Sequence, residues 1–118
     1  FYWALCVGQI TKPLKLTTPI NNQKAYTKVD ILKNHEEFTE LKVELVTGRT
    51  HQIRQHLAAI NHPLVGDRRY GKPTRNNKEN TRLALHATSV CFPHPQRNGQ
   101  VLEITSPIPY GEFPFLNY

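Results

Sequence analysis

The sequence contains no methionine, only two cysteines and no long apolar run. Cys6 and Cys91 are too few for a disulfide framework and form no CxxC motif, so we expect reduced, half-buried thiols in a cytoplasmic protein. The nearest approach to a long apolar run, residues 4–10, is far too short to cross a membrane, and no secretory signal is visible. Because the chain begins Phe-Tyr-Trp without a methionine, we expect a piece of something longer.

Motifs for several common chemistries are also absent. There is no P-loop, no G-x-G-x-x-G, no H-E-x-x-H and no Ser-His-Asp order around a nucleophile elbow. The six histidines fall at irregular intervals, and no cysteine or carboxylate cluster completes a site around them. Structural histidines are therefore favoured over zinc ligands, and no metal is expected. Bound zinc in the purified chain would instead indicate a metal-binding structural domain.

Positive charge is concentrated in one part of the chain. Residues 49–82 contain eight Lys and Arg against two Asp and Glu, which accounts for the whole net charge of +6, whereas the remainder has seven of each sign. Such a concentration indicates a polyanionic partner, and nucleic acid is favoured over a membrane because no basic amphipathic helix accompanies it. On charge alone, a solvated basic loop is an equally good interpretation.

Hydrophobic periodicity predicts more strands than helices. Apolar or alternating runs predict strands over these segments: 2–7, 25–32, 38–46, 83–92 and 100–105. Asn34-His35-Glu36-Glu37 predicts a hairpin, and residues 14–16 a short extended piece within a loop. The Pro-rich tail 107–114 either packs or frays. We therefore expect an α+β fold with a mainly antiparallel, mixed sheet and few helices.

One helix is predicted from Thr50 onward. Ile53, Leu57 and Ile60 recur at the spacing of one buried helical face, Thr50 is a suitable N-cap, and His62-Pro63 ends the pattern.

The start of this helix carries an unusual concentration of cations. Arg49, His51 and Arg54 lie where the first-turn N–H groups already make the helix end positive. Positive side chains there are unfavourable unless an anion lies among them, so we expect this segment to receive a negative group.

The same segment resembles the signature of a known enzyme family. TGRTHQIRQHLAAINHPLVGDRRYG, residues 47–71, matches the RluA-type pseudouridine synthase pattern TGRxHQ(I/L)RxHxxxxxHPxxGDxxYG. Tyr2-Trp3-Ala4-Leu5 with Val7-Gly8 resembles the family's Y-x-A-x-V-x-G strand, and residues 82–87 with His94-Pro95 resemble its RLxLHA…HP segment. The resemblance spans nearly the whole chain. It implies part of a catalytic domain that isomerises uridine to pseudouridine in ribosomal or transfer RNA, without cofactor or metal.

One motif of the family is absent. Its HRLDxxTSG segment, which carries the nucleophilic aspartate, precedes the Y-x-A strand, and this chain begins at that strand. Asp30 lies in a predicted strand and Asp67 belongs to the family's own HPxxGD turn, so neither is expected to replace the nucleophile. The resemblance therefore implies that residues 1–118 are the C-terminal portion of a catalytic domain, inactive alone.

The resemblance also implies a catalytic site. Arg54 matches the arginine that pairs with the catalytic aspartate, so we expect it to have no carboxylate partner within this chain. Tyr2 matches the tyrosine that lies against the target base and is proposed to assist proton removal, and Leu85 matches an apolar residue of the uracil pocket. All three should face one open concavity. The plainer interpretations are a surface arginine, a core aromatic residue and a core leucine.

Further residues are expected to contact RNA or to support the fold. Phosphate-binding cations are predicted at Arg49, Arg68, Arg69, Lys72, Arg75 and Lys78. Tyr70 is a candidate for stacking on a base or ribose, with packing in its own turn as the equal alternative. His51 and Gln52 are expected to hold the helix entry through side-chain bonds to nearby backbone.

Two expectations concern the chain as a whole. A non-catalytic RNA-binding module that has lost its nucleophile is the alternative to an enzyme fragment. An incomplete sheet exposes an edge and an apolar face, so we also expect self-association.

Overall fold

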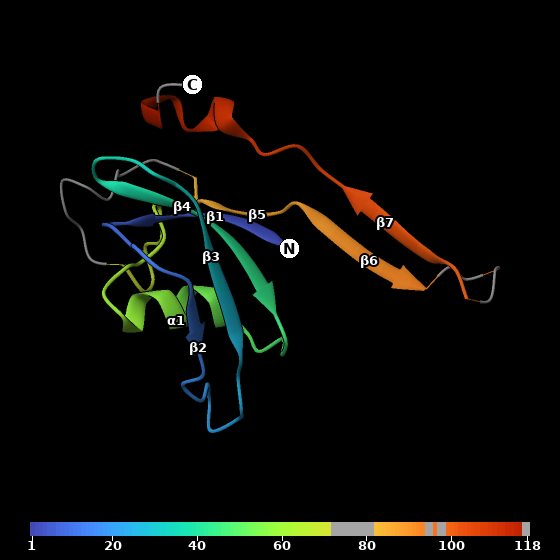
Figure 1. Cartoon of the computed structure of the whole chain (residues 1–118). Coiled ribbons are helices and arrows are strands. Elements are labelled where there is room, and N and C mark those ends of the chain that lie inside the picture. Colours follow the sequence, from blue (N-terminus) through green and yellow to red (C-terminus); the bar gives the residue numbers. More distant parts are fainter. Residues whose placement is uncertain (72–81, 94–95, 97–98, 117–118) are drawn as a thin grey trace.

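The computed structural model describes residues 1–71, 82–93, 96 and 99–116. Five strands form one antiparallel sheet in the order β2-β3-β4-β1-β5 (Figure 1). Their bounds are β1 Tyr2–Val7, β2 Leu14–Leu16, β3 Thr27–Asn34, β4 Phe38–Leu45 and β5 Leu85–Ala87. A helix, α1 (Gln52–Ala59), lies on one face of this sheet. The expected α+β class, with a mainly antiparallel sheet and few helices, is confirmed.

The predicted hairpin is formed by β3 and β4. Its register runs from Thr27 opposite Leu45 to Asn34 opposite Thr39, with an irregularity between Ile31 and Lys33. The alternation that predicted these strands is visible in β3, where buried or half-buried residues alternate with exposed ones from Thr27 to Leu32. One face of the hairpin therefore packs on α1 while the other carries charged residues.

The inner strand β1, which lies between β4 and β5, is buried on both faces. Ala4 and Cys6 join the hydrophobic cluster that includes Leu57 of α1, whereas Trp3 and Leu5 join a second cluster on the opposite face. Successive side chains of a strand point to opposite faces, so β1 contributes to both cores. Burial raises the pKa of the Cys6 thiol to about 11, which leaves it neutral and unreactive at neutral pH.

The cysteines differ from the sequence expectation. Both were expected to be half-buried, but Cys6 is fully buried and Cys91 is exposed, and both are free thiols.

The second core is closed by the C-terminal tail, which packs rather than frays. It contains two short 3-10 helices, η1 (Tyr110–Glu112) and η2 (Pro114–Leu116). The rings of Trp3 and Phe113 lie 5.2 Å apart, and Glu40, only 1% exposed, accepts hydrogen bonds from Trp3 Nε1 at 3.1 Å and from the Tyr110 hydroxyl at 2.9 Å. Burial and the Glu40 carboxylate raise the pKa of Tyr110 to about 12, so this hydroxyl remains a donor.

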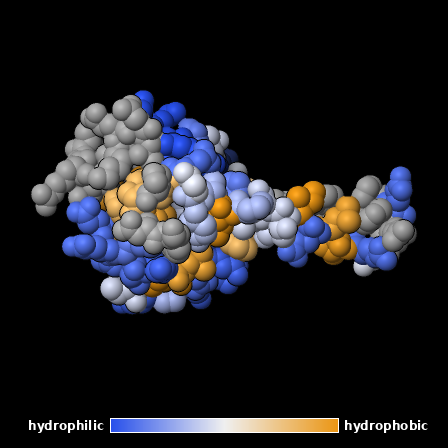
Figure 2. Space-filling model, turned by 90° about the horizontal axis from the view of Figure 1, so that it is seen from above, coloured by the Kyte–Doolittle hydropathy of each residue, from blue (hydrophilic) through white to orange (hydrophobic). Residues whose placement is uncertain are grey.

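The predicted strand over residues 83–92 is in fact two strands in different sheets. β5 pairs with β1, and β6 (Ser89–Pro93) pairs with β7 (Val101–Thr105). The break falls at Thr88, because the Phe1 carbonyl accepts the backbone N–H groups of both Thr88 and Ser89. β6 and β7 form an arm that projects from the body (Figures 1 and 2). The radius of gyration is accordingly 15.1 Å, against about 13.5 Å for a compact chain of this length.

Within the described part of the chain, no helix has the length and apolar character needed to cross a membrane.

Candidate functional site

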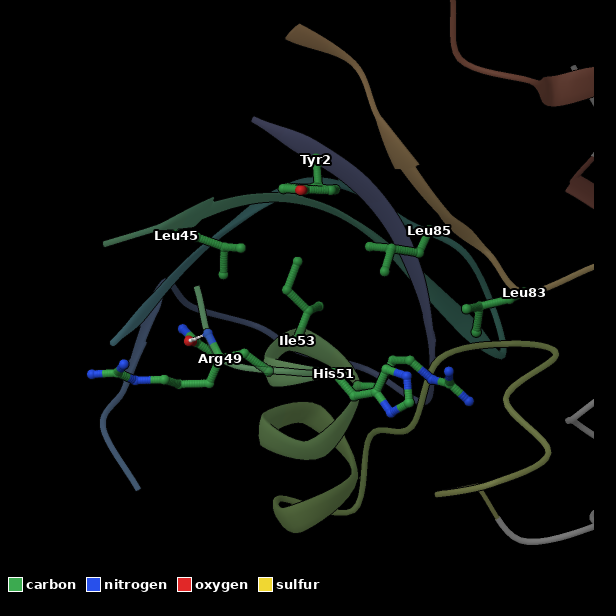
Figure 3. Close-up of a pocket in the computed structure, with 9 residues that line it drawn as sticks. Tyr2, Leu45, Arg49, His51, Ile53, Leu83 and Leu85 are labelled. Atoms are coloured by element: carbon green, nitrogen blue, oxygen red, sulfur yellow. Dashed lines mark hydrogen bonds between the residues drawn. The ribbon is translucent and has the colours of Figure 1, made fainter. Parts of the chain in front are cut away.

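A pocket of about 280 Å³ lies between the start of α1 and the strands β1, β4 and β5. Its lining residues are Tyr2, Leu45, Arg49, His51, Gln52, Ile53, Arg54, Leu83 and Leu85. Figure 3 shows Tyr2, Leu45 and Leu85 reaching down from the strands towards Ile53 of the helix. Tyr2, Arg54 and Leu85, far apart in sequence, therefore line one concavity, as the family resemblance implied.

The helix does not begin as predicted. Thr50 was expected to cap it, but His51 occupies the N-cap position in a left-handed conformation, with φ of 52°, and no side chain caps the helix. Thr50 is exposed and its carbonyl oxygen instead accepts a hydrogen bond from Gln55 Nε2 at 3.0 Å. The Thr50 prediction was therefore wrong.

Gln52 holds the helix entry, as predicted. Its Oε1 accepts the backbone N–H of Arg49 at 3.0 Å and the Thr47 hydroxyl at 2.7 Å. Its Nε2 donates to the Tyr26 carbonyl and to Thr27 Oγ1, each at 2.9 Å. The side chain is 2% exposed, so all four bonds of a buried amide are made inside the protein. This network joins the loop before α1 to β3.

Arg54 has a carboxylate partner within the chain. Its Nε donates to Asp67 Oδ2 at 3.1 Å and its Nη2 donates to Asp67 Oδ1 at 2.9 Å, which makes a bidentate ion pair. The side chain of Asp67 is fully buried and that of Arg54 is 18% exposed. The expectation that Arg54 would lack an internal carboxylate was therefore wrong, because the HPxxGD turn folds back against the first turn of α1.

The environment of Asp67 keeps it ionised. Burial opposes ionisation, but hydrogen bonds from Arg54 and from the backbone N–H groups of Tyr70 and Arg69 outweigh it and lower the pKa of Asp67 below its ordinary value of 3.8. The hydrogen bond that Arg54 donates to Asp67 raises the pKa of Arg54 despite its partial burial. Both partners are therefore charged at neutral pH.

Tyr70 packs between its own turn and the start of α1. Its hydroxyl lies 3.0 Å from His51 Nδ1, and its ring centroid lies 5.2 Å from Arg54 Cζ and 5.4 Å from Arg69 Cζ. His51 thus bonds to a side chain and not to the nearby backbone that was expected. Packing of Tyr70 in the turn is observed, and its stacking on a base or ribose stays a prediction.

The predicted phosphate-binding cations are dispersed. Arg49 lines the pocket, although its Nε donates to the Lys24 carbonyl at 2.8 Å and its side chain extends away from Leu85 (Figure 3). Arg68 and Arg69 are exposed in the turn after the helix. Lys72, Arg75 and Lys78, together with His94-Pro95, lie outside the described residues.

The histidines near the site have structural partners. His56 Nε2 lies 2.7 Å from the Thr18 carbonyl and Nδ1 lies 2.7 Å from Thr27 Oγ1, while His62 Nδ1 lies 2.9 Å from the Val7 carbonyl. Carbonyl oxygens can only accept, so His56 Nε2 and His62 Nδ1 donate to them. Among the residues that the structure describes, no three His, Cys, Asp or Glu side chains are grouped so that they could hold a metal ion.

Sequence reasoning missed several members of the site. Asp67 was assigned only to a turn, and its contact with Arg54, thirteen residues earlier, has no periodic signal. A Gly-Asp pair does predict a turn in which the carboxylate accepts following N–H groups, and Asp67 Oδ1 accepts those of Arg69 and Tyr70, each at 3.0 Å. Leu45 and Leu83 were predicted only as strand residues.

Known proteins resemble this chain in sequence and fold. Residues 1–59 match the model of the RNA pseudouridylate synthase family. Ribosomal large subunit pseudouridine synthase D of Buchnera aphidicola is 43% identical over 100 residues, which cover 73% of this chain and 32% of that protein. The protein of the same name from Vibrio cholerae is 37% identical over 133 residues, which cover 92% of this chain and 41% of that protein.

A solved structure confirms the shared fold. Human RNA Pseudouridylate Synthase Domain Containing 1 matches with a TM-score of 0.73 and 23% identity, over 92% of this chain and 54% of that one. The chain thus spans between 32% and 41% of the length of the two curated relatives described above.

The ion pair predicts a specific acid sensitivity. Replacing Asp67 with Asn should lower the free energy of unfolding by roughly 2–3 kcal/mol at neutral pH, because it leaves the Arg54 charge partly buried without a partner. The wild-type advantage should be complete above pH 3.8 and should be lost as the pH falls through the lower pKa of the folded state, because the unfolded carboxyl binds its proton first. Urea unfolding followed by circular dichroism across this range measures the effect.

Glu112→Gln is the matched control. Its pair, Arg82 Nη1 to Glu112 Oε2 at 2.7 Å, joins side chains that are 38% and 55% exposed, so its loss should cost less than about 1 kcal/mol. Equal losses in the two variants would contradict the assignment.

Proposed function

Because the chain belongs to the RNA pseudouridylate synthase family, we propose that the protein containing it isomerises uridine to pseudouridine in RNA. The shared pocket of Tyr2, Arg54 and Leu85 is the observation that carries this proposal. Residues 1–118 form the C-terminal portion of the catalytic domain, and the nucleophilic aspartate belongs to a segment outside this sequence. The names of the relatives favour ribosomal RNA over transfer RNA as the substrate.

The proposed reaction assigns a role to each of the three residues. The aspartate attacks a uridine that has been flipped from its stack, and the detached base turns and rejoins the sugar through carbon. Arg54 orients the attacking carboxylate, Tyr2 lies against the base and assists removal of the proton from that carbon, and Leu85 supports the apolar face of the ring. The rearrangement is redox-neutral, so it requires no redox cofactor.

The natural gene product, with whatever residues it encodes before Phe1, tests this function. It should release tritium from ribosomal RNA labelled at the C5 position of uridine, because the new carbon–carbon bond displaces that hydrogen. The 118-residue chain alone should release none, because the nucleophile is not in its sequence. Release by the chain alone would place the nucleophile within these residues. No release by the natural product would favour the alternative, a non-catalytic RNA-binding module.

We also propose that the turn after α1 binds RNA phosphates. Arg68 and Arg69 are exposed beside the pocket, whereas Lys15 and Lys28 lie opposite each other on β2 and β3 and point away from α1. Replacing Arg68 and Arg69 with Ala should reduce the magnitude of the log–log salt slope of RNA binding by about one to two units.

The control for this measurement is the double replacement of Lys15 and Lys28 with Ala, which removes the same charge from the other face. An unchanged slope after loss of Arg68 and Arg69, with a reduced one in the control, would place the RNA on the opposite face. The free thiols of Cys6 and Cys91 support a cytoplasmic location for the proposed RNA modification.

The isolated chain is further proposed to self-associate through the β6–β7 arm. Val101, Leu102 and Ile104 are 68%, 36% and 58% exposed, and the register places Leu102 and Ile104 opposite Phe92 and Val90. In Figure 2, hydrophobic residues, coloured orange, lie on the surface of the arm. Apolar side chains beside a free strand edge favour pairing with another chain.

Sedimentation velocity over a range of concentrations tests this association. The double variant Leu102→Lys and Ile104→Lys should shift the chain towards monomer. Glu103→Gln, on the other face of the same strand, should not. A wild-type chain that remains monomeric at high concentration would contradict the proposal.

A further inference from the structure

The bidentate pair leaves one edge of Arg54 unoccupied. A guanidinium has five N–H donors, and Asp67 takes one from Nε and one from Nη2. The remaining donors, two on Nη1 and one on Nη2, point away from Asp67, and no partner for them is found among the described residues. Arg54 also lines the site pocket and is 18% exposed. Its second edge is therefore available to a ligand.

Asp67 determines the direction of that edge. The guanidinium is planar, so two hydrogen bonds along one side fix the orientation of the other. Asp67 Oδ1 also accepts the backbone N–H of Tyr70 at 3.0 Å, which places the Tyr70 ring 5.2 Å from Arg54 Cζ. The Tyr70 hydroxyl lies 3.0 Å from His51 Nδ1, in the left-handed residue at the helix start. One carboxylate thus places both the cation and its aromatic neighbour.

We propose that Asp67 is a positioning residue, which holds Arg54 by its Nε–Nη2 edge so that its Nη1–Nη2 edge receives a second carboxylate in the pocket. This inference rests on the proposed function, in which that carboxylate is the nucleophile. Two parallel N–H groups match the two oxygens of a carboxylate and fix its orientation as well as its charge. Fixed geometry matters because small displacements of a reacting group cost large factors in rate.

Asp67→Asn separates positioning from support of the turn. The amide oxygen can still accept the N–H groups of Arg69 and Tyr70, but its NH₂ group faces the Nε–H of Arg54, donor against donor. In the natural gene product, the single-turnover rate should fall by about 10-fold or more, while the dissociation constant for RNA changes by less than about 3-fold. Glu112→Gln, which removes the surface partner of Arg82, should leave both values unchanged.

A double-mutant cycle tests whether Asp67 affects the reaction rate through Arg54. Arg54→Lys cannot offer the planar fork, so adding Asp67→Asn to it should lower the rate little further. Independent, multiplying losses would overturn the proposal, as would an unchanged rate in Asp67→Asn. Loss of RNA affinity equal to the loss of rate would show that the free edge holds an RNA phosphate, which also overturns it.

One measurement uses only the wild-type protein, so it remains possible even if Asp67→Asn does not fold. In the wild-type protein, NMR should show slow solvent exchange of the Arg54 Nε–H compared with the exposed Arg68 and Arg69. Exchange as fast as in those residues would overturn the proposal. If the natural gene product forms no pseudouridine, the proposed function fails and so does the role assigned here. If it forms pseudouridine and Asp67→Asn is as fast, only the positioning role fails.

Discussion

The ion pair between Arg54 and Asp67 joins the first turn of α1 to the turn that follows the helix, and the candidate site depends on it. No acidic residue lies in the first turn of α1, so the Arg54 charge adds to a helix end that is already positive. Asp67 compensates this charge from outside the helix, at 2.9 Å, and its own burial is compensated by the same contact together with two backbone N–H groups. Removal of either partner would leave a partly or fully buried charge.

The elements around this pair are held independently of it. Tyr2 begins β1, which is packed between α1 on one face and the C-terminal tail on the other. The chain leaves β1 at Gly8, where φ is +87° and a Cβ atom would lie 2.9 Å from His62 Nδ1, so only glycine fits. Gln52 secures the helix entry to β3 through its buried amide. The pocket is thus lined mainly by residues of a packed framework, which is the arrangement that precise chemistry requires.

Patterns within short stretches of sequence predicted the elements whose formation depends on neighbouring residues. The β3–β4 hairpin and the face of α1 that carries Ile53 and Leu57 follow from alternation and helical spacing, and both are present. The break at Thr88 could not be predicted, because it is caused by the Phe1 carbonyl, which lies 87 positions earlier in the chain. The Thr50 cap failed for a related reason: the polar groups at the helix entry are satisfied by Gln52, a residue inside the helix.

The positive charge at the start of α1 predicts a nearby anion but not where in the protein that anion comes from. The two arginines of that segment, Arg49 and Arg54, predicted an anion. The structure provides Asp67, which lies within the chain and not in a segment outside it. A Coulomb interaction depends on distance and dielectric and not on separation along the chain, so charge alone gives the sign of a partner and never its source. The geometry of the N–H donors adds what charge does not give, which is the number and direction of the partners that Arg54 can hold. A guanidinium bound along one edge still has another, so the internal partner that was unexpected is compatible with the external one that was expected, and it supplies the fixed orientation that the second contact needs.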